Sequence, residues 1–366
     1  MKLSQPKSAR TINKARVLGA IRRDENLSRA ELARLLELNK VSVGEIVEDL
    51  VSEGFIEEVG KLESSNGRKA TALKLIPDSS FVLSVNIESR NTTISLCDLK
   101  ANPIRFERIP TNTKVKVEEF CVGIIKSCIR VMKLVDASKV IGAGITVSGR
   151  ISEDSAIILE CPYLPWKNIP LAEAFEQVLK LKACIRNSTA ALVLAERFVS
   201  SKDFLESKGP VMYLNWGDNV NLAFIQNGKV FADYNGFGHL KMAQTGLCWC
   251  GDIGCLEAVV SAWALSNNGE AHLKELWPTV SQEALETLGK ALILASKVTG
   301  STKVIIGGEG STIPPSYKKI IEKCCNGLSF ELSNLGERAN MIAAAEVALD
   351  EWVYMTSLLE EVKNVL

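Results

Sequence analysis

The sequence predicts an α/β protein in which an N-terminal winged helix-turn-helix precedes a larger region of alternating strands and helices. Residues 12–75 combine three short helical segments with a hairpin, and from residue 81 onward apolar strand-like segments alternate with helical ones. A chain of 366 residues is also too long for one small core. We place the domain boundary at Pro77–Asp78, which divides the chain into residues 1–77 and 78–366.

Three segments near the N-terminus have the periodicity of amphipathic helices. The first covers residues 12–23. The second, residues 28–36, begins with Ser28 and Glu31, the spacing of a capping box. The third covers residues 41–53 and follows a short turn, which is the arrangement of a helix-turn-helix.

A hairpin follows these helices. Residues 55–59 and 71–75 read as strands, and residues 60–69 form a polar tip with two cations near its end. A helix-turn-helix with such a hairpin is a winged helix. A flexible basic wing of this kind suits contact with phosphates or with a narrow minor groove.

Residues 1–40 hold ten lysines and arginines against four acidic residues, which indicates a nucleic-acid partner. In a winged helix, the start of the third helix faces the major groove. The candidate DNA-binding residues are Ser28, Arg29, Asn39, Lys40, Val41, Ser42, Arg68 and Lys69. The alternative is a three-helix packing module without a role in DNA binding.

The larger part alternates strands and helices, which is typical of α/β architecture. Predicted strands cover residues 81–87, 92–98, 140–147, 211–216, 222–225 and 303–308, and predicted helices cover residues 118–133, 171–179 and 190–199.

Bulk composition narrows the class of protein. Hydrophobic residues make up 46% and charged residues 23%, and the net charge is zero, so the whole chain is not a general polyanion binder. No segment reaches the roughly 18 apolar residues that span a bilayer, and the N-terminus does not resemble a secretory signal. The ten cysteines lack the spacing of a disulfide framework. We therefore expect a cytoplasmic protein with reduced thiols and no membrane partner.

One imidazole and three thiols lie within 17 residues, as His239, Cys248, Cys250 and Cys255. Nitrogen and sulfur donors suit tetrahedral Zn²⁺, and four protein ligands are typical of a closed structural site. Neighbouring glycines allow the tight turns that such a site needs. The alternative is a group of buried free thiols, because cysteine is among the most buried residue types.

Four motifs together resemble the ROK family of repressors, open reading frames and sugar kinases. They are the zinc segment with Asn235–His239, the wing sequence Ser64–Lys69, the stretch from Gly142 to Arg150, and Gly307–Gly310. The resemblance covers nearly the whole chain after residue 10. It implies a winged helix joined to an actin-like, two-lobed fold, with a sugar bound in the cleft between the lobes and a structural Zn²⁺ nearby.

Three departures from the ROK kinases argue against an enzyme. The kinases carry Asp-x-Gly-Gly-Thr after their first strand, where glycines admit ATP phosphate; here Asn86–Thr92 lacks both glycines and contains Glu88. The kinase base is the aspartate of Asn-Asp, here Asn187–Ser188. The second phosphate-holding turn reads Gly217–Asn221, with an aspartate in it.

The sugar site of the family is altered as well. Gly236 stands where the family has a sugar-binding glutamate, and Tyr163 where it has an asparagine. The candidate effector-binding residues are Gly149, Arg150, Tyr163, Asn187, Ser188, His239 and Glu257, with Tyr163 or Trp166 able to stack on an apolar sugar face. The alternative is that Arg150, Asn187 and Glu257 make structural hydrogen bonds. We expect a small sugar or cyclitol different from glucose, or no small ligand.

Taken together, these features favour a DNA-binding transcriptional regulator, acting as a repressor of carbohydrate catabolism genes. A homodimer or higher oligomer would bind operator DNA, and a sugar or cyclitol would release it. Two alternatives stay open: a ROK sugar kinase with a DNA-binding head, and a repressor that no small molecule controls.

Overall fold

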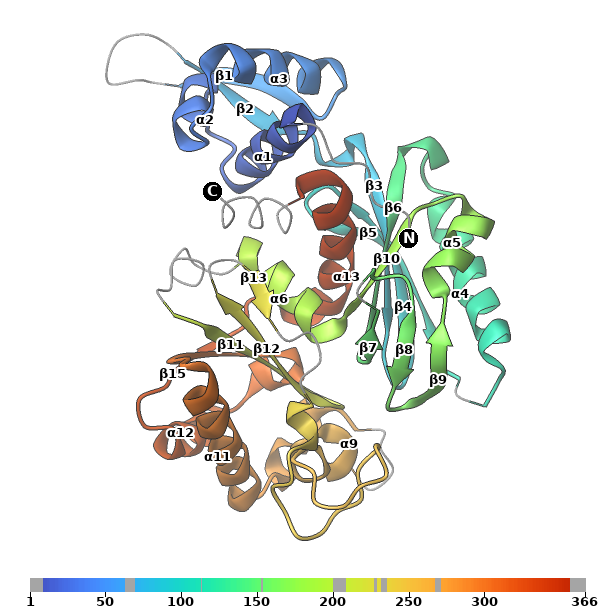
Figure 1. The fold of residues 1–366 in the computed structure, drawn as a ribbon, viewed down its shortest axis with the longest axis vertical. Coiled ribbons are helices and arrows are strands. Elements are labelled where there is room, and N and C mark those ends of the chain that lie inside the picture. Colours follow the sequence, from blue (N-terminus) through green and yellow to red (C-terminus); the bar gives the residue numbers. More distant parts are fainter. Residues whose placement is uncertain are drawn as a thin grey trace.

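The computed structural model describes residues 9–62, 70–112, 114–152, 154–199, 209–226, 229–231, 236–266 and 271–355. A small head lies at one end of the molecule, and two lobes, each built on a five-stranded sheet, lie below it (Figure 1). The first lobe contains residues 81–187, and the second contains residues 211–332.

The head is a winged helix, as the sequence predicts. Its elements are α1 (Ala9–Arg23), α2 (Arg29–Leu35), α3 (Lys40–Ser52), β1 (Ile56–Leu62) and β2 (Ala70–Leu75). Ser28 begins α2 through the predicted capping box with Glu31, and the Asn39 side chain begins α3 by accepting a hydrogen bond from the Val41 amide. The wing tip, including Arg68 and Lys69, falls outside the described residues.

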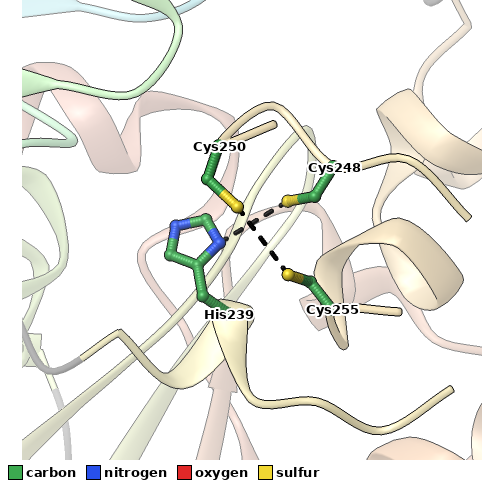
Figure 2. A group of neighbouring side chains, drawn as sticks. All are labelled: His239, Cys248, Cys250 and Cys255. Atoms are coloured by element: carbon green, nitrogen blue, oxygen red, sulfur yellow. Dashed lines mark hydrogen bonds between the residues drawn. The ribbon is translucent and has the colours of Figure 1, made fainter. Parts of the chain in front are cut away.

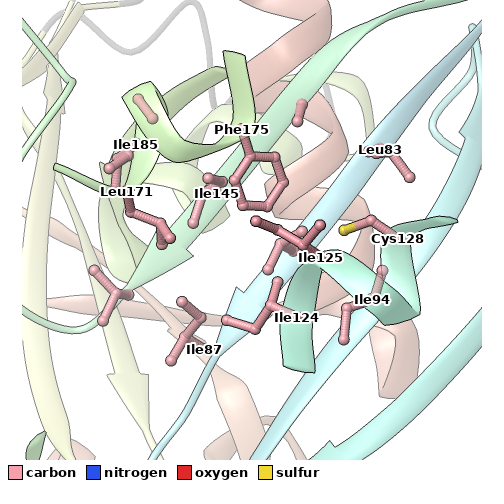
Figure 3. Close-up of a cluster of buried hydrophobic side chains, with 14 of the residues drawn as sticks. Leu83, Ile87, Ile94, Ile124, Ile125, Cys128, Ile145, Leu171, Phe175 and Ile185 are labelled. Carbon is pink, nitrogen blue, oxygen red and sulfur yellow. The ribbon is translucent and has the colours of Figure 1, made fainter. Parts of the chain in front are cut away.

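The first lobe is a sheet in the order β10-β6-β3-β4-β5 with helices packed on one face. Its elements are β3 (Phe81–Ile87), β4 (Asn91–Asp98), β5 (Pro103–Pro110), α4 (Val117–Met132), β6 (Val140–Val147), α5 (Leu171–Leu179) and β10 (Ala183–Asn187). Phe175 of α5 and Ile124 of α4 pack against Ile145 and Ile87 of the sheet (Figure 3). A smaller sheet of β7 (Arg150–Ile151), β8 (Ile158–Cys161) and β9 (Leu164–Ile169) adjoins it.

The second lobe has a sheet in the order β13-β12-β11-β14-β15. Its strands are β11 (Val211–Trp216), β12 (Val220–Gln226), β13 (Lys229–Phe231), β14 (Lys303–Gly307) and β15 (Ser329–Leu332). Its helices are α8 (Glu257–Val260), α9 (Ala262–Leu265), α10 (Leu273–Leu276), α11 (Gln282–Thr299) and α12 (Pro315–Cys324). Ser281 caps the start of α11, and Gly300 ends it in the left-handed conformation.

The two large sheets share one topology. In each, the first three strands form an antiparallel meander, and two later strands lie parallel to the first. The β3–β4 turn of the first lobe is therefore equivalent to the β11–β12 turn of the second. This duplication is the two-lobed, actin-like arrangement that the resemblance implies.

Two helices, α6 (Ser188–Val199) and α13 (Ala339–Leu349), lie between the sheets (Figure 1). Helix α13 packs on β3, β6 and α6. Gly144 of β6 makes this close packing possible, because a Cβ there would lie 1.9 Å from the Ala344 carbonyl oxygen of α13. Helix α13 has no amphipathic pattern by which the sequence could predict it, since nearly all of its side chains are buried.

The head shares its hydrophobic core with the end of α13 and the turn that follows it. Leu18 and Ile21 of α1 belong to one buried cluster with Leu349 and with Tyr354 of the π-helical turn Asp350–Tyr354. Arg22 of α1 forms a buried ion pair with Glu346 of α13. The division at residues 77 and 78 stays a prediction, and no helix in the described ranges is long and apolar enough to cross a membrane.

Candidate functional site

His239, Cys248, Cys250 and Cys255 converge in space, as the spacing predicts. One nitrogen or sulfur ligand atom from each lies within 4.8 Å of the other three. Figure 2 shows the imidazole facing the three sulfurs. Cys248 Sγ lies 3.5 Å from His239 Nδ1, and Cys250 Sγ lies 3.7 Å from Cys255 Sγ. A tetrahedral Zn²⁺ with Zn–S bonds of about 2.3 Å would separate two sulfurs by about 3.8 Å, so the donor set fits such an ion.

Backbone turns in the loop between Leu240 and Leu256 bring these ligands together. The Gly251 amide donates to the Cys248 carbonyl, and the Cys248 amide donates to the Asp252 carbonyl, which folds the two cysteines of the Cys-x-Cys pair inward. Gly254 is required here, because its φ is +79° and a Cβ would lie 2.0 Å from the Ala243 carbonyl oxygen. Burial lowers the pKa of His239 and so keeps its imidazole neutral, the form that binds metals.

Glu257 connects this loop to the second lobe's sheet. Its Oε2 accepts a hydrogen bond of 2.9 Å from the Val220 amide at the start of β12. Burial raises its pKa to about 7. Gly238 fits beside it only as glycine, since a Cβ would lie 2.2 Å from the Val220 carbonyl oxygen. The metal-ligand loop is therefore fixed to the β11–β12 hairpin.

Several predicted effector residues meet where the lobes approach each other. The Tyr163 hydroxyl donates to the Ser148 carbonyl at 2.6 Å, and Asn219 of the second lobe donates to the Tyr163 hydroxyl at 3.2 Å. Asn187 donates to the Gly149 carbonyl and caps α6 by accepting from the Thr189 amide.

Other predicted effector residues are placed differently. Arg150 is exposed and pairs with Glu160 at 3.4 Å. The His239 ring lies within the thiol cluster. The Ser188 hydroxyl is buried without a hydrogen-bond partner among the described residues. Trp166 packs in the first lobe's core against Phe120, with ring centroids 5.5 Å apart, so it is not available to stack on a sugar.

Sequence reasoning missed Trp249, which lies between two candidate metal ligands. Its ring meets Tyr163 edge-on at 6.1 Å and lies 4.5 Å from Trp263. It also packs against the first lobe's hydrophobic core. The sequence could have indicated Trp249 through its position between Cys248 and Cys250, because a metal that binds both cysteines also fixes the residue between them.

Residues 82–345 match the sequence model of the ROK family. The chain belongs to the ROK family. One ROK relative, the xylose repressor of Caldicellulosiruptor bescii, is 29% identical over 264 residues, which cover 69% of this chain and 65% of that protein. The match thus spans slightly less than two thirds of that relative. The DNA-binding transcriptional dual regulator NagC of Escherichia coli is 25% identical over 348 residues, covering 86% of this chain and 84% of NagC.

Solved ROK structures show the same fold. A ROK family transcriptional regulator, a homologue of the E. coli MLC protein, matches with a TM-score of 0.77 at 22% identity, covering 97% of this chain and 99% of that one. A ROK glucokinase from Streptomyces griseus, in complex with glucose and AMPPNP, matches with a TM-score of 0.61 at 19% identity. It covers 73% of this chain and 99% of the kinase chain.

The head of this ROK protein exposes part of its predicted DNA face. Lys40, Val41 and Ser42 are exposed at the start of α3. The Ser28 hydroxyl is buried and bonded to Glu31, which leaves it little surface for DNA. Arg29 forms ion pairs with two acidic residues, Glu48 at 3.3 Å and Glu58 at 3.1 Å.

Glu88, in the turn where ROK kinases have glycines, gives a pH-dependent prediction. Burial, reinforced by the Asp218 carboxylate, raises its pKa from 4.5 to about 7. Since the folded pKa is the higher one, this group favours folding most below pH 4.5, and the contribution is lost as pH rises through about 7. In the original chain the free energy of unfolding should fall as the pH rises from about 5 to about 8. In Glu88→Gln we expect this fall to be smaller by up to about 3 kcal/mol. Urea unfolding at several pH values in this range measures the unfolding free energy. If it depends on pH equally in Glu88→Gln and in the original chain, the raised pKa of Glu88 is contradicted. Exposed Glu337→Gln serves as the control.

Proposed function

We propose that this chain is a DNA-binding transcriptional repressor of carbohydrate catabolism genes, which works in the cytoplasm as a homodimer and is released by a small sugar or cyclitol. The observation that carries the proposal is a winged helix with an exposed recognition-helix start, joined to a ROK body that lacks the kinase base. Relatives named xylose repressor and N-acetylglucosamine repressor support it.

The start of α3 is the proposed reading surface. Asn39 caps the helix, so Lys40, Val41 and Ser42 project from its first turn. Val41 is 68% exposed, unusual for an apolar side chain, and its methyl groups suit contact with the C5-methyl group of thymine in the major groove. Lys40 and Ser42 offer a charge and a hydroxyl to phosphates and base edges.

Acidic residues of the head limit its general attraction to DNA. Residues 1–77 hold 14 basic and 11 acidic residues, because acids between positions 41 and 58 offset the basic excess of the first 40 residues. Arg10 pairs with Asp49 at 2.7 Å, and Lys14 pairs with Glu53. Affinity for the operator would then depend on cations outside these pairs, among which we place Lys40, Arg68 and Lys69.

We expect the double variant Arg68→Ala/Lys69→Ala to weaken operator binding and to reduce the slope of log K against log salt by about 2, since each cation would neutralise one phosphate. Fluorescence anisotropy with labelled operator at several salt concentrations measures this. The matched control is Lys290→Ala/Lys323→Ala, two exposed lysines on α11 and α12 of the second lobe. Equal salt slopes in both variants would remove the wing from the interface.

For the effector, we propose a site formed by Tyr163, Asn187, Glu257 and the neighbouring Asn219. Amide and carboxyl groups of this kind bind the hydroxyls of a polyol. We propose Zn²⁺ as the metal of the His239 cluster. With four protein ligands the ion would have no open position, so its role would be to hold the loop and Glu257 in place.

Enzymatic activity is not part of the proposal, because Ser188 has no low-pKa acceptor to take a proton from a sugar hydroxyl. The alternatives are a sugar kinase and a repressor without a small ligand. A sugar-dependent ATP turnover abolished by Ser188→Ala would favour the kinase.

The decisive experiment selects DNA from a random duplex pool with the full chain and then tests release of the selected DNA by xylose, glucose, N-acetylglucosamine and myo-inositol. We expect an enriched inverted repeat, as a two-fold symmetric dimer requires. Failure to enrich any sequence would contradict the function. If a DNA sequence is enriched but none of these compounds releases it, the repressor without a small ligand is favoured. The same holds if none of them raises the melting temperature of the protein.

A further inference from the structure

The turn between β3 and β4, residues 88–90, lies against the equivalent turn of the other lobe, residues 217–219 between β11 and β12. Ser89 Oγ donates to Asp218 Oδ2 at 3.0 Å. The Arg90 guanidinium forms an ion pair with the same carboxylate and donates to the Ala271 carbonyl at 3.0 Å. One acidic side chain of the second lobe thus receives two side chains of the first.

This contact is partly shielded from water and held from behind. The Arg90 and Asp218 side chains are 21% and 22% exposed, so their attraction is screened less than that of a surface pair. The Thr111 amide donates to the Arg90 carbonyl, and the Glu88 amide donates to the Asn91 carbonyl, which fixes the turn to β5 and β4. Arg90 reaches the second lobe from a rigid base.

The same turn is also bonded to α13. Glu88 Oε1 accepts a hydrogen bond of 2.6 Å from Asn340 Nδ2, near the start of that helix. Six residues later, about 9 Å along the axis, Glu346 pairs with Arg22 of the head. One helix therefore links the interlobe turn to the DNA-binding head.

We infer that residues 88–90 form an interlobe clasp: Ser89 and Arg90 hold the lobes together through Asp218, and α13 couples the closed arrangement to the position of the head. In the ROK kinases this turn is glycine-rich and admits ATP phosphate. Here the Ser89, Arg90 and Asp218 side chains pair with one another across this turn and take the place that the glycines leave for a phosphate. The clasped arrangement is the one that binds the operator, and an effector bound against Asn219, the neighbour of Asp218 in the same turn, acts by shifting this turn and disturbing the clasp. This inference rests on the proposed function.

Charge reversal tests the clasp. Arg90→Asp and Asp218→Arg each place like charges together, and the double variant restores an opposite pair with its direction exchanged. We expect each single variant to separate the lobes, seen as an increased radius of gyration in small-angle X-ray scattering, and to weaken operator binding about tenfold, within the usual range of allosteric coupling. The double variant should recover affinity to within about threefold of the original chain.

The matched control is the pair Arg130 and Glu107, which lies within the first lobe, between α4 and β5. Arg130→Asp and Glu107→Arg should change neither quantity. Single variants with the original scattering curve and operator affinity would overturn the clasp, and so would singles that the double variant does not rescue. If the original chain binds no DNA, the proposed function fails, while the scattering comparison still decides whether the clasp exists.

Discussion

Glu346→Ala should destabilise the folded chain by about 3–5 kcal/mol, because it leaves the buried Arg22 guanidinium without its carboxylate partner. The two side chains are 5% and 2% exposed, so water cannot replace the lost interaction. Arg22 would keep its contact with the Lys100 carbonyl and its position 4.8 Å from the Tyr354 ring, but neither supplies a carboxylate to replace Glu346. Urea unfolding followed by tryptophan fluorescence measures the loss.

Glu337→Ala is the matched control, since Glu337 is exposed just before α13 and its removal should cost less than about 0.5 kcal/mol. The double variant Arg22→Met/Glu346→Leu should recover most of the stability, because apolar side chains of similar volume avoid burying a lone charge. If Glu346→Ala is as stable as Glu337→Ala, the ion pair does not hold the head to α13.

Cys250→Ser should lower the zinc content of the purified chain and destabilise the second lobe by several kcal/mol, since the binding energy of a structural zinc contributes directly to folding. Leu247 and Ile253, two apolar side chains of the loop between Leu240 and Leu256, are exposed and contribute little to its packing. Elemental analysis gives the metal per chain, and thermal unfolding gives the stability.

Cys324→Ser, a half-buried thiol on α12 outside the cluster, is the matched control and should keep its zinc. A chelator should lower the melting temperature of the original chain and of Cys324→Ser, but not that of Cys250→Ser. An original chain that is metal-free and insensitive to the chelator would exclude the zinc site.

Features that depend on neighbouring residues were predictable from the sequence. The Ser28–Glu31 capping box defines the start of α2 because all its hydrogen bonds lie within one turn. The four metal-ligand candidates converge for a similar reason: the glycines between them determine local turns, with no need of distant contacts.

Features that depend on distant pairs were not predictable. Arg90 and Asp218 are 128 positions apart, and the equivalence of their turns appears only in strand order, with no repeat in the sequence. The charge of residues 1–40 overstated the positive charge of the head, because six acidic residues between positions 41 and 58 offset it. Trp166 and Tyr163 were equivalent stacking candidates in the sequence. Only the folded structure shows that Trp166 packs in the first lobe's core and that Tyr163 lies between the lobes.

The shared core of the head has a consequence for the order of synthesis. Residues 9–75 leave the ribosome long before Leu349 and Tyr354, which complete their core, and the ion pair of Arg22 spans 324 positions. Such a contact has a very high contact order, and its loop must close before it contributes any stability. A nascent chain therefore carries a head whose core lacks Leu349 and Tyr354 until both lobes have been synthesised.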